Sequence, residues 1–284
     1  MHDVFHFIEH VTLDTLKLVP FLFLTYLVME ALEHKAGEKT HNVVKKAGRL
    51  GPVVGSLAGV LPQCGFSAAA SNLYAGRVIT LGTLIAIYLS TSDEMLPIMI
   101  SAKVPFVTIL GILGIKVFIG MMAGLLIDVF LSARRDEHHH IHEMCEEENC
   151  HCEKGIFVSA LIHTVHITIF ILLINFMLEL LLETIGEEML SGLLLNKPIA
   201  GQLIAGLVGL IPNCASSVAI TELYLEGALG LGAMMSGLLV NAGIGVLILF
   251  RVNRDRKENI KILCLLYAIG VLAGIGLEFL PIQL

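Results

Sequence analysis

The sequence predicts an all-α polytopic membrane protein made of two inverted repeats, each with three spanning helices and one Pro-broken re-entrant hairpin. Three observations predict this fold class: the composition, a motif that occurs twice, and the distribution of Lys and Arg. Hydrophobic residues make up 56% of the 284 residues and charged residues only 15%. Such a chain is too apolar for one soluble core and is typical of a protein that lies in a bilayer.

The repeated motif indicates a duplication. Residues 59–67 read Gly-Val-Leu-Pro-Gln-Cys-Gly-Phe-Ser, and 150 residues later residues 209–217 read Gly-Leu-Ile-Pro-Asn-Cys-Ala-Ser-Ser. Downstream Leu-Tyr and Leu-Gly pairs match at the same offset. Shared Pro, Cys, Tyr and Ser at one spacing are not explained by apolar composition alone. We therefore predict a first repeat at 1–131, a linker at 132–155 and a second repeat at 156–284.

The apolar runs define the individual spans. Four runs are long enough to cross about 30 Å of hydrocarbon at about 1.5 Å per residue: 11–33, 102–131, 156–185 and 261–281. The stretches between them, 51–100 and 198–250, are too short for three full spans each. Since each opens with the Pro-x-Cys segment, we predict re-entrant hairpins at 51–75 and 199–225, each followed by one span. Counting the hairpin arms separately gives ten segments.

Lys and Arg predict the orientation of the copies. Loops 34–49 and 251–261 each carry five Lys or Arg residues, whereas loop 186–197 carries one Lys and the termini carry few. Because cytoplasmic loops are enriched in Lys and Arg, the first two loops should be cytoplasmic and the third outside. Equivalent loops then face opposite sides, so the copies are inverted. We expect a multi-pass protein of a prokaryotic cytoplasmic (inner) membrane, with both termini outside and the linker in the cytoplasm.

The two Pro-broken tips are the predicted substrate site. A proline leaves backbone carbonyls unpaired, and the half-helix after it begins with unpaired N–H groups, so ions of either sign could bind. The tips are Pro62, Gln63 and Cys64 in the first copy and Pro212, Asn213 and Cys214 in the second. Paired sulfur ligands suit trivalent arsenic, zinc or copper(I). Further candidate ligands are Ser67, Ser71, Ser217, Thr221 and Asn241. The alternative is a kinked helix in which each cysteine packs as a small apolar residue.

Three acidic residues are candidates for ion coupling. Asp93 and Glu94 end a Ser-Thr-Ser-Asp-Glu segment in the first copy, and Glu222 follows the broken tip of the second copy. Acids at membrane depth usually bind ions or carry protons, so a proton or a sodium ion is the candidate coupling ion. Acids solvated at the end of a span are the alternative.

The linker carries a cluster of imidazole and thiol side chains. These groups are ligands of zinc, nickel and copper, but their spacing fits no closed structural zinc site. We interpret the linker as a cytoplasmic segment that captures or senses metal, with a solvated polar connector as the alternative. The candidate ligands are His138, His139, His140, His142, Cys145, Cys150, His151 and Cys152.

With its Gly-x-x-Pro-x-Cys-x-x-Ser repeats and its Ser-Thr-Ser-Asp-Glu segment, almost the whole chain resembles a family of ten-transmembrane heavy-metal exporters. That family is similar to arsenic efflux permeases and is labelled in part as manganese transporters. In the permeases a Pro-x-Cys-x-Cys pattern follows the same glycine, whereas here each motif keeps only the first cysteine, Cys64 or Cys214. The resemblance implies efflux and a metal or metalloid substrate.

Together these features predict a secondary transporter, not an enzyme, that exports a metal or metalloid ion by alternating access around the two tips. The sequence contains no P-loop and no His-Glu-x-x-His motif, which disfavours ATP-driven transport and zinc hydrolase activity. The expected partners are the bilayer and the metal substrate, without nucleic acid or a resident cofactor, and a homodimer is compatible with the sequence. An organic-anion or small-acid carrier and an ion channel are the alternatives.

Overall fold

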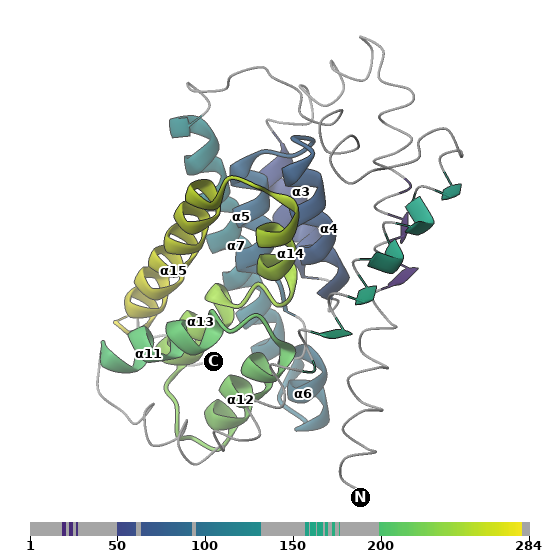
Figure 1. Ribbon diagram of the computed structural model, residues 1–284. Coiled ribbons are helices and arrows are strands. Elements are labelled where there is room, and N and C mark those ends of the chain that lie inside the picture. The colour runs from purple at the N-terminus through teal and green to yellow at the C-terminus, as the bar shows by residue number, and fades with distance from the viewer. Residues whose placement is uncertain are drawn as a thin grey trace, which may run out of the picture.

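A computed structural model describes the central helices of both copies (Figure 1). The described residues are 50–60, 64–92, 95–131 and 199–279, with single positions in 19–27 and 157–176. All regular secondary structure in these ranges is α-helical, which confirms the predicted all-α class. Apart from those single positions, the predicted first helix of each copy lies outside the described residues, as do the linker and both termini.

The described helices form two sets in the same order. The first set is α3 (Gly51–Gly59), α4 (Cys64–Ala75), α5 (Leu81–Ser90), α6 (Met95–Ser101) and α7 (Phe106–Leu131). The second set is α11 (Ala200–Gly209), α12 (Cys214–Leu225), α13 (Leu231–Val240), α14 (Gly245–Val252) and α15 (Arg256–Glu278). Helices α12 to α15 each begin 150 residues after their counterparts. The helices thus recur at the same offset as the sequence motif.

Each copy has a helix break at its Pro-x-Cys segment. Helix α3 ends at Gly59 and α4 begins at Cys64, and in the second copy α11 ends at Gly209 and α12 begins at Cys214. A proline within this stretch cannot donate to the preceding turn and its ring clashes with that turn, so the helix stops before it. We call these two interruptions the proline breaks.

The span after each proline break is also interrupted, which the sequence analysis above does not predict. Helix α5 is separated from α6 after Ser90, and α13 is separated from α14 after Val240. The backbone turns extended at Asn241, whose side-chain oxygen accepts a hydrogen bond of 2.7 Å from the N–H of Gly243. Amide side chains commonly stabilise turns in this way. We call these interruptions, at residues 91–92 and 241–244, the mid-span breaks.

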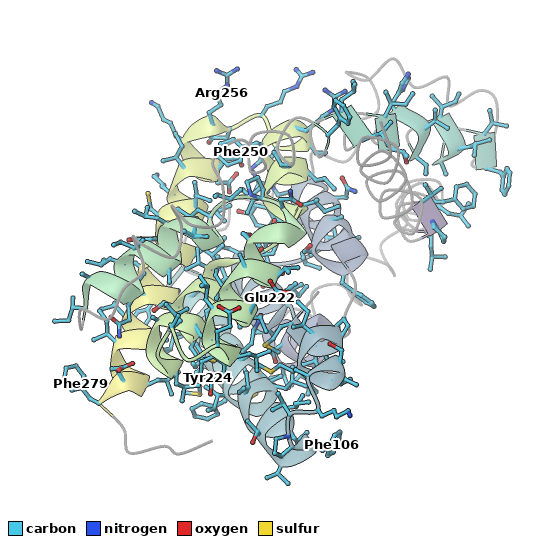
Figure 2. All side chains as sticks on the ribbon, turned by 90° about the horizontal axis from the view of Figure 1, so that it is seen from below. Phe106, Glu222, Tyr224, Phe250, Arg256 and Phe279 are labelled. Carbon is cyan, nitrogen blue, oxygen red and sulfur yellow. The ribbon has the colours of Figure 1, made fainter. Side chains whose placement is uncertain are left out.

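The interrupted spans form the centre of the molecule, and α7 and α15 lie outside them. Within the described residues, four helical stretches are long and apolar enough to cross a membrane. Leu81–Ser101 and Leu231–Val252 are 75% and 83% buried, whereas Phe106–Phe130 and Arg256–Glu278 are each only 33% buried. Figure 2 shows Phe106 and Phe279, each 74% exposed, at the edge of the helix set. Large apolar side chains on an outer face indicate contact with lipid, and the protein is a multi-pass membrane protein.

The two copies interlock through their short helices. Helix α4 packs against α14, α12 packs against α6, and α5 contacts α13. At the α4–α14 contact, a Cβ on Gly245 would lie 2.8 Å from the Cβ of Ser67 and 2.9 Å from its carbonyl oxygen. Only glycine permits this approach, as small residues commonly do where membrane helices pack. The hydroxyl of Ser71 donates to the carbonyl of Gly245 over 2.7 Å, which fixes the contact.

A carboxylate from the outer helix caps the N-terminus of the central helix in both copies. The backbone N–H of Gly82 donates to Asp128 over 3.0 Å, and the N–H of Gly232 donates to Glu278 over 3.0 Å. A negative charge at a helix N-terminus satisfies a first-turn donor and complements the helix dipole. The two pairs are related by the 150-residue offset, so each copy fastens its outer helix to its central helix in the same way.

Candidate functional site

A small pocket lies where the mid-span breaks of the two copies meet, and we call it the central pocket. Its lining comes from α6, α7 and the first mid-span break, and from α12, α13 and the second mid-span break. The lining residues are Thr91, Ser92, Met95, Lys116, Ser217, Leu238 and Asn241. Both copies therefore contribute to one concave, partly polar site, which is where substrate sites of transporters with internal repeats are found.

In the second copy a chain of hydrogen bonds connects the mid-span break to the proline break. The Asn241 side-chain NH₂ donates to the hydroxyl of Ser216 over 2.9 Å, and that hydroxyl donates to the carbonyl of Asn213 over 2.7 Å. All three residues are buried. Sequence reasoning named Asn213 and Asn241 but missed Ser216, whose place in the Cys-Ala-Ser-Ser run after the proline was its only signal.

The first copy makes the corresponding connection with a single hydrogen bond. The hydroxyl of Ser92, in the mid-span break, donates to the carbonyl of Val60 over 2.8 Å, and Val60 directly follows α3 at the proline break. Carbonyls at the end of a helix lack an intrahelical partner, so this hydroxyl satisfies one of them. In both copies the lining of the central pocket is thus bonded to the proline break.

Lys116 is the charged residue of the central pocket and is only 1% exposed. Its ammonium donates to the carbonyl of Leu238 over 3.1 Å and to the carbonyl of Thr91. Thr91 directly follows α5, and Leu238 lies in the last turn of α13. The ammonium therefore lies at the C-terminal ends of two helices, where carbonyls are available and the dipole is negative. Sequence reasoning missed Lys116, although a lysine in the middle of an apolar span is itself a signal of function.

The predicted substrate ligands fall into two groups. Ser217 and Asn241 line the central pocket. The hydroxyl of Ser71 instead lies 2.7 Å from the carbonyls of both Ser67 and Gly245, which share its one proton, and 2.7 Å from the hydroxyl of Tyr88. Thr221 donates to the carbonyl of Ser217 within its own helix. The Ser71 contacts join α4 to α5 and α14, whereas the Thr221 bond stays within α12.

Several predicted residues are placed elsewhere or lie outside the described part of the chain. The side chain of Glu222 is exposed on α12 and does not line the central pocket. Cys64 and Cys214 begin α4 and α12, but their side chains are outside the described set, and so are Pro62, Gln63, Asp93, Glu94 and the linker ligands. Among the residues that the structure does describe, no three His, Cys, Asp or Glu side chains gather to hold a metal ion.

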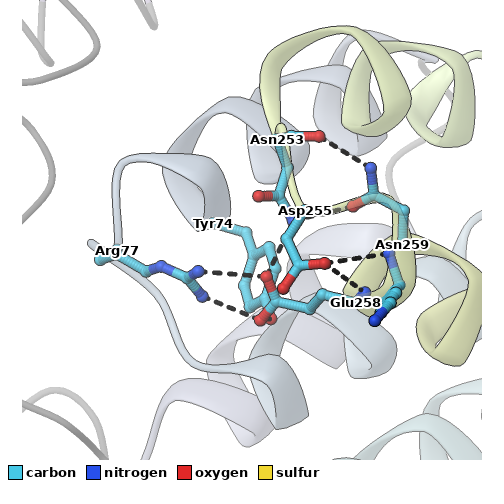
Figure 3. Close-up of polar contacts among 7 residues, drawn as sticks. Tyr74, Arg77, Asn253, Asp255, Glu258 and Asn259 are labelled. Carbon is cyan, nitrogen blue, oxygen red and sulfur yellow. Dashed lines mark hydrogen bonds and ion pairs between the residues drawn. The ribbon is translucent and has the colours of Figure 1, made fainter.

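A second polar group joins the two copies at one end of the helix set, and we call it the α4–α15 cluster (Figure 3). Its members are Tyr74, Arg77, Asn253, Glu258 and Asn259. The carboxylate of Glu258 accepts from the hydroxyl of Tyr74 over 2.6 Å, from the guanidinium of Arg77 over 3.0 and 3.1 Å, and from Asn253 over 3.0 Å. The hydrogen bonds to Glu258 raise the pKa of Arg77, so the pairing stabilises the charged form of the guanidinium.

The α4–α15 cluster has no counterpart in the other copy. Arg77 lies in a turn with a φ of 57°, and the residue 150 positions later is Gly227 with a φ of 75°. The residue equivalent to Glu258 is Thr108. The turns after α4 and α12 thus share a left-handed backbone conformation, which favours glycine. The ion pair of Arg77 with Glu258 is made only by the turn after α4.

A sequence profile for the family described as "Putative, 10TM heavy-metal exporter" matches residues 6–153 and 129–250. No curated protein and no solved structure matches the chain. Because the two matched segments together span residues 6–250 of the 284, the chain belongs to this family of ten-transmembrane heavy-metal exporters.

Proposed function

We propose that the protein is a secondary-active transporter that exports a metal or metalloid ion by alternating access around the central pocket. The observation that carries the proposal is that this pocket is lined by the mid-span breaks of both copies. A movement of one copy against the other would open and close it. The bonds of Ser92 and Asn241 toward the proline breaks support the same mechanism, because a shift of either break would reach the pocket.

The chemistry of the pocket suits a soft or borderline ion. Met95 supplies a buried thioether, which favours soft metals, and Ser217 and Asn241 supply oxygen ligands. Cys64 and Cys214 begin the helices that follow the proline breaks, and we propose that their sulfur atoms complete the ligand set. Trivalent arsenic, zinc and copper(I) fit this ligand set, whereas manganese, which the family resemblance implies, prefers oxygen ligands.

The proposed topology follows from the distribution of charge. We place loops 34–49 and 251–261 and the linker 132–155 in the cytoplasm and both termini outside, in a prokaryotic inner membrane. The arms around each proline break are then re-entrant hairpins that enter from opposite faces. Such a carrier would use a proton or a sodium ion for coupling, and pairing into a homodimer is compatible with the exposed apolar faces of α7 and α15.

The proposed function is tested by metal content in cells. A strain that lacks the gene should accumulate one metal or metalloid and become sensitive to it, and both effects should disappear when the gene is restored. Cellular content measured by mass spectrometry, metal by metal, identifies the substrate. Absence of metal-dependent flux in membrane vesicles of either orientation would refute transport of a metal by this protein.

A small organic anion is the second candidate substrate. The ammonium of Lys116 and the amide of Asn241 favour it, since both can donate to a carboxylate and both line the pocket. Uptake of radiolabelled carboxylates into vesicles, compared with uptake of metals under the same gradient, separates the two classes. A flux that rises linearly with concentration without saturation would indicate a channel instead of a carrier.

The His/Cys linker is proposed to capture metal on the cytoplasmic side. Deleting residues 137–153 removes its imidazole and thiol ligands without touching the described helices. We expect a higher apparent KM for the exported metal, an unchanged maximal rate and an unchanged melting temperature in detergent. An unchanged KM would reduce the linker to a solvated connector.

A further inference from the structure

The exposed face of α15 is basic at one end and apolar beyond it. Lys257 and Lys261 lie in its first two turns and are both exposed, with the exposed Arg256 beside them. Exposed apolar residues follow on the same side as far as Leu272, which is 68% exposed. Side chains three, four or seven residues apart share one face of a helix, so these residues form a continuous stripe. We call it the α15 stripe, made of Lys257, Ile260, Lys261, Cys264, Ala268 and Leu272.

The corresponding helix of the first copy, α7, is apolar from its first turn. At the positions 150 residues before the three cations it carries Phe106, Val107 and Gly111. Phe106 and Val107 are 74% and 79% exposed, so this end of α7 meets its surroundings with apolar side chains. Figure 2 shows Arg256 and Phe106 at opposite edges of the helix set. The repeated fold therefore does not require the cations of α15.

The cations of α15 are not neutralised by the acids next to them in the sequence. Residues 251–261 hold five Lys or Arg residues and two acids. Asp255 accepts from two backbone N–H groups in the first turn of α15, over 2.9 and 3.1 Å, and Glu258 is held in the α4–α15 cluster. In the part of the chain that the structure describes, no acid pairs with Arg256, Lys257 or Lys261. These side chains are therefore able to bind an anion from outside the protein.

We propose that the α15 stripe binds an anionic phospholipid of the bilayer. The phosphodiester headgroup would lie at Arg256, Lys257 and Lys261, because ammonium and guanidinium groups make charge-assisted hydrogen bonds to phosphate oxygens. Clusters of Lys and Arg beside a membrane span attract anionic lipids for the same reason. The proposal concerns the bilayer and not the transported ion, so it does not rest on the proposed function.

The apolar part of the α15 stripe has the length of an acyl chain. Lys261 and Leu272 are eleven residues apart, which is about 16 Å along a helix. This distance is roughly half of a hydrocarbon core of about 30 Å, and half of the core is the depth of one leaflet. A lipid whose headgroup lies at the basic end therefore extends its chains along the apolar residues of the same face.

A second copy of the chain is the other occupant that an exposed apolar helix could accept. Two copies in one bilayer, related by a twofold axis, would bring the same patch of each together. Pairing of two α15 stripes would thus place the cations of one beside those of the other, and like charges in contact are destabilising. The charge of the α15 stripe favours an anionic lipid over a second copy.

The proposal is tested by the phospholipid that stays bound to the purified full-length protein. The protein is equilibrated in detergent micelles with equal amounts of phosphatidylglycerol and phosphatidylcholine of the same acyl chains, and then passed through size-exclusion chromatography. Mass spectrometry gives the lipid retained per protein. We expect at least about a fivefold excess of phosphatidylglycerol, the factor that one Lys or Arg near an anionic surface contributes, and loss of the excess in about 1 M salt. Equal retention of the two lipids would indicate solvated cations and would overturn the proposal.

A triple variant and a control of equal charge locate the binding. Arg256→Gln, Lys257→Gln and Lys261→Gln together should lower the retained phosphatidylglycerol at least about fivefold. The control removes three cations from loop 34–49 through Lys35→Gln, Lys39→Gln and Arg49→Gln, and should retain most of the lipid. An equal loss in both variants would show that retention follows net charge, which contradicts a site on the α15 stripe.

Two further measurements separate the lipid from other occupants. Soluble glycerol phosphate, which is a headgroup without acyl chains, should displace no more lipid than salt of the same ionic strength; stronger displacement would show a phosphate site without the apolar stripe. Light scattering gives the mass of the complex, and a dimer that Leu272→Asn dissociates would place a second copy on the α15 stripe instead. Melting temperatures show which variants fold, and the wild-type lipid preference decides the case even if the triple variant does not.

Discussion

The contact between α13 and α15 provides a sharp test of the packing. Gly274 faces α13, and a Cβ placed on it would lie 2.4 Å from the carbonyl oxygen of Gly232 and 1.9 Å from the hydroxyl of Ser236. The hydroxyl can rotate away, but the carbonyl belongs to a helix backbone. Since ordinary contact begins at 3.4 Å, Gly274→Ala must push the two helices apart by about 1 Å, at a cost of about 1–3 kcal/mol for overpacking.

Gly276 is the matched control on the same helix. A Cβ there meets nothing within 4 Å, so Gly276→Ala gains only the helix preference of alanine, about 0.5–1 kcal/mol. Gly274→Ala gains that same preference, and the difference between the two variants therefore isolates the packing cost. We expect Gly274→Ala to melt about 2–12 °C below Gly276→Ala in detergent. Equal melting temperatures would refute the close approach of α13 and α15.

Two further predictions concern the α4–α15 cluster and the cysteines. Tyr74→Phe removes a hydrogen bond to a charged acceptor and should lower the free energy of unfolding by about 1.5–3 kcal/mol. Arg77→Ala removes a half-exposed ion pair worth only about 0.2–1 kcal/mol, so Tyr74→Phe should have the lower melting temperature. The reverse order of melting temperatures would contradict the geometry of the cluster. Cys64→Ala or Cys214→Ala should each lower metal affinity in vesicles by at least about tenfold, as loss of a metal site's supporting residues does, while Cys264→Ala, an exposed cysteine of α15, should have no effect. Full transport by the double variant of Cys64 and Cys214 would reduce these two cysteines to packing residues.

The sequence predicted the proline breaks because they depend on local chemistry. Proline in the first turn of a helix is tolerated, but further along it removes a donor and clashes with the preceding turn, so Pro62 and Pro212 were sufficient to place the ends of α3 and α11. The mid-span breaks have no proline. They depend on an amide turn at Asn241 and on a Thr91 backbone that turns extended, and neither residue type prevents a helix by itself.

Some of the residues that line the central pocket could be identified only from the folded structure. Ser217 and Asn241 were predicted from their place in the repeat, whereas Lys116 and Met95 join them only because α7 and α6 pack beside the mid-span breaks. The carboxylate caps were missed for the same reason. Asp128 and Glu278 stand at the ends of long apolar helices, where an acid is ordinarily interfacial, and their role depends on the N-terminus of another helix 46 residues away.

The α4–α15 cluster would make the two ends of the proposed carrier unequal in energy. If the two copies of such a carrier exchanged conformations perfectly, its inward-facing and outward-facing states would have equal free energy. Here Glu258 binds Tyr74 and Arg77 across one end, while Thr108 and Gly227 occupy the matching positions. Closure of the end that carries the cluster would therefore be favoured in the proposed carrier, which would give it a preferred resting orientation through the divergence of a few side chains.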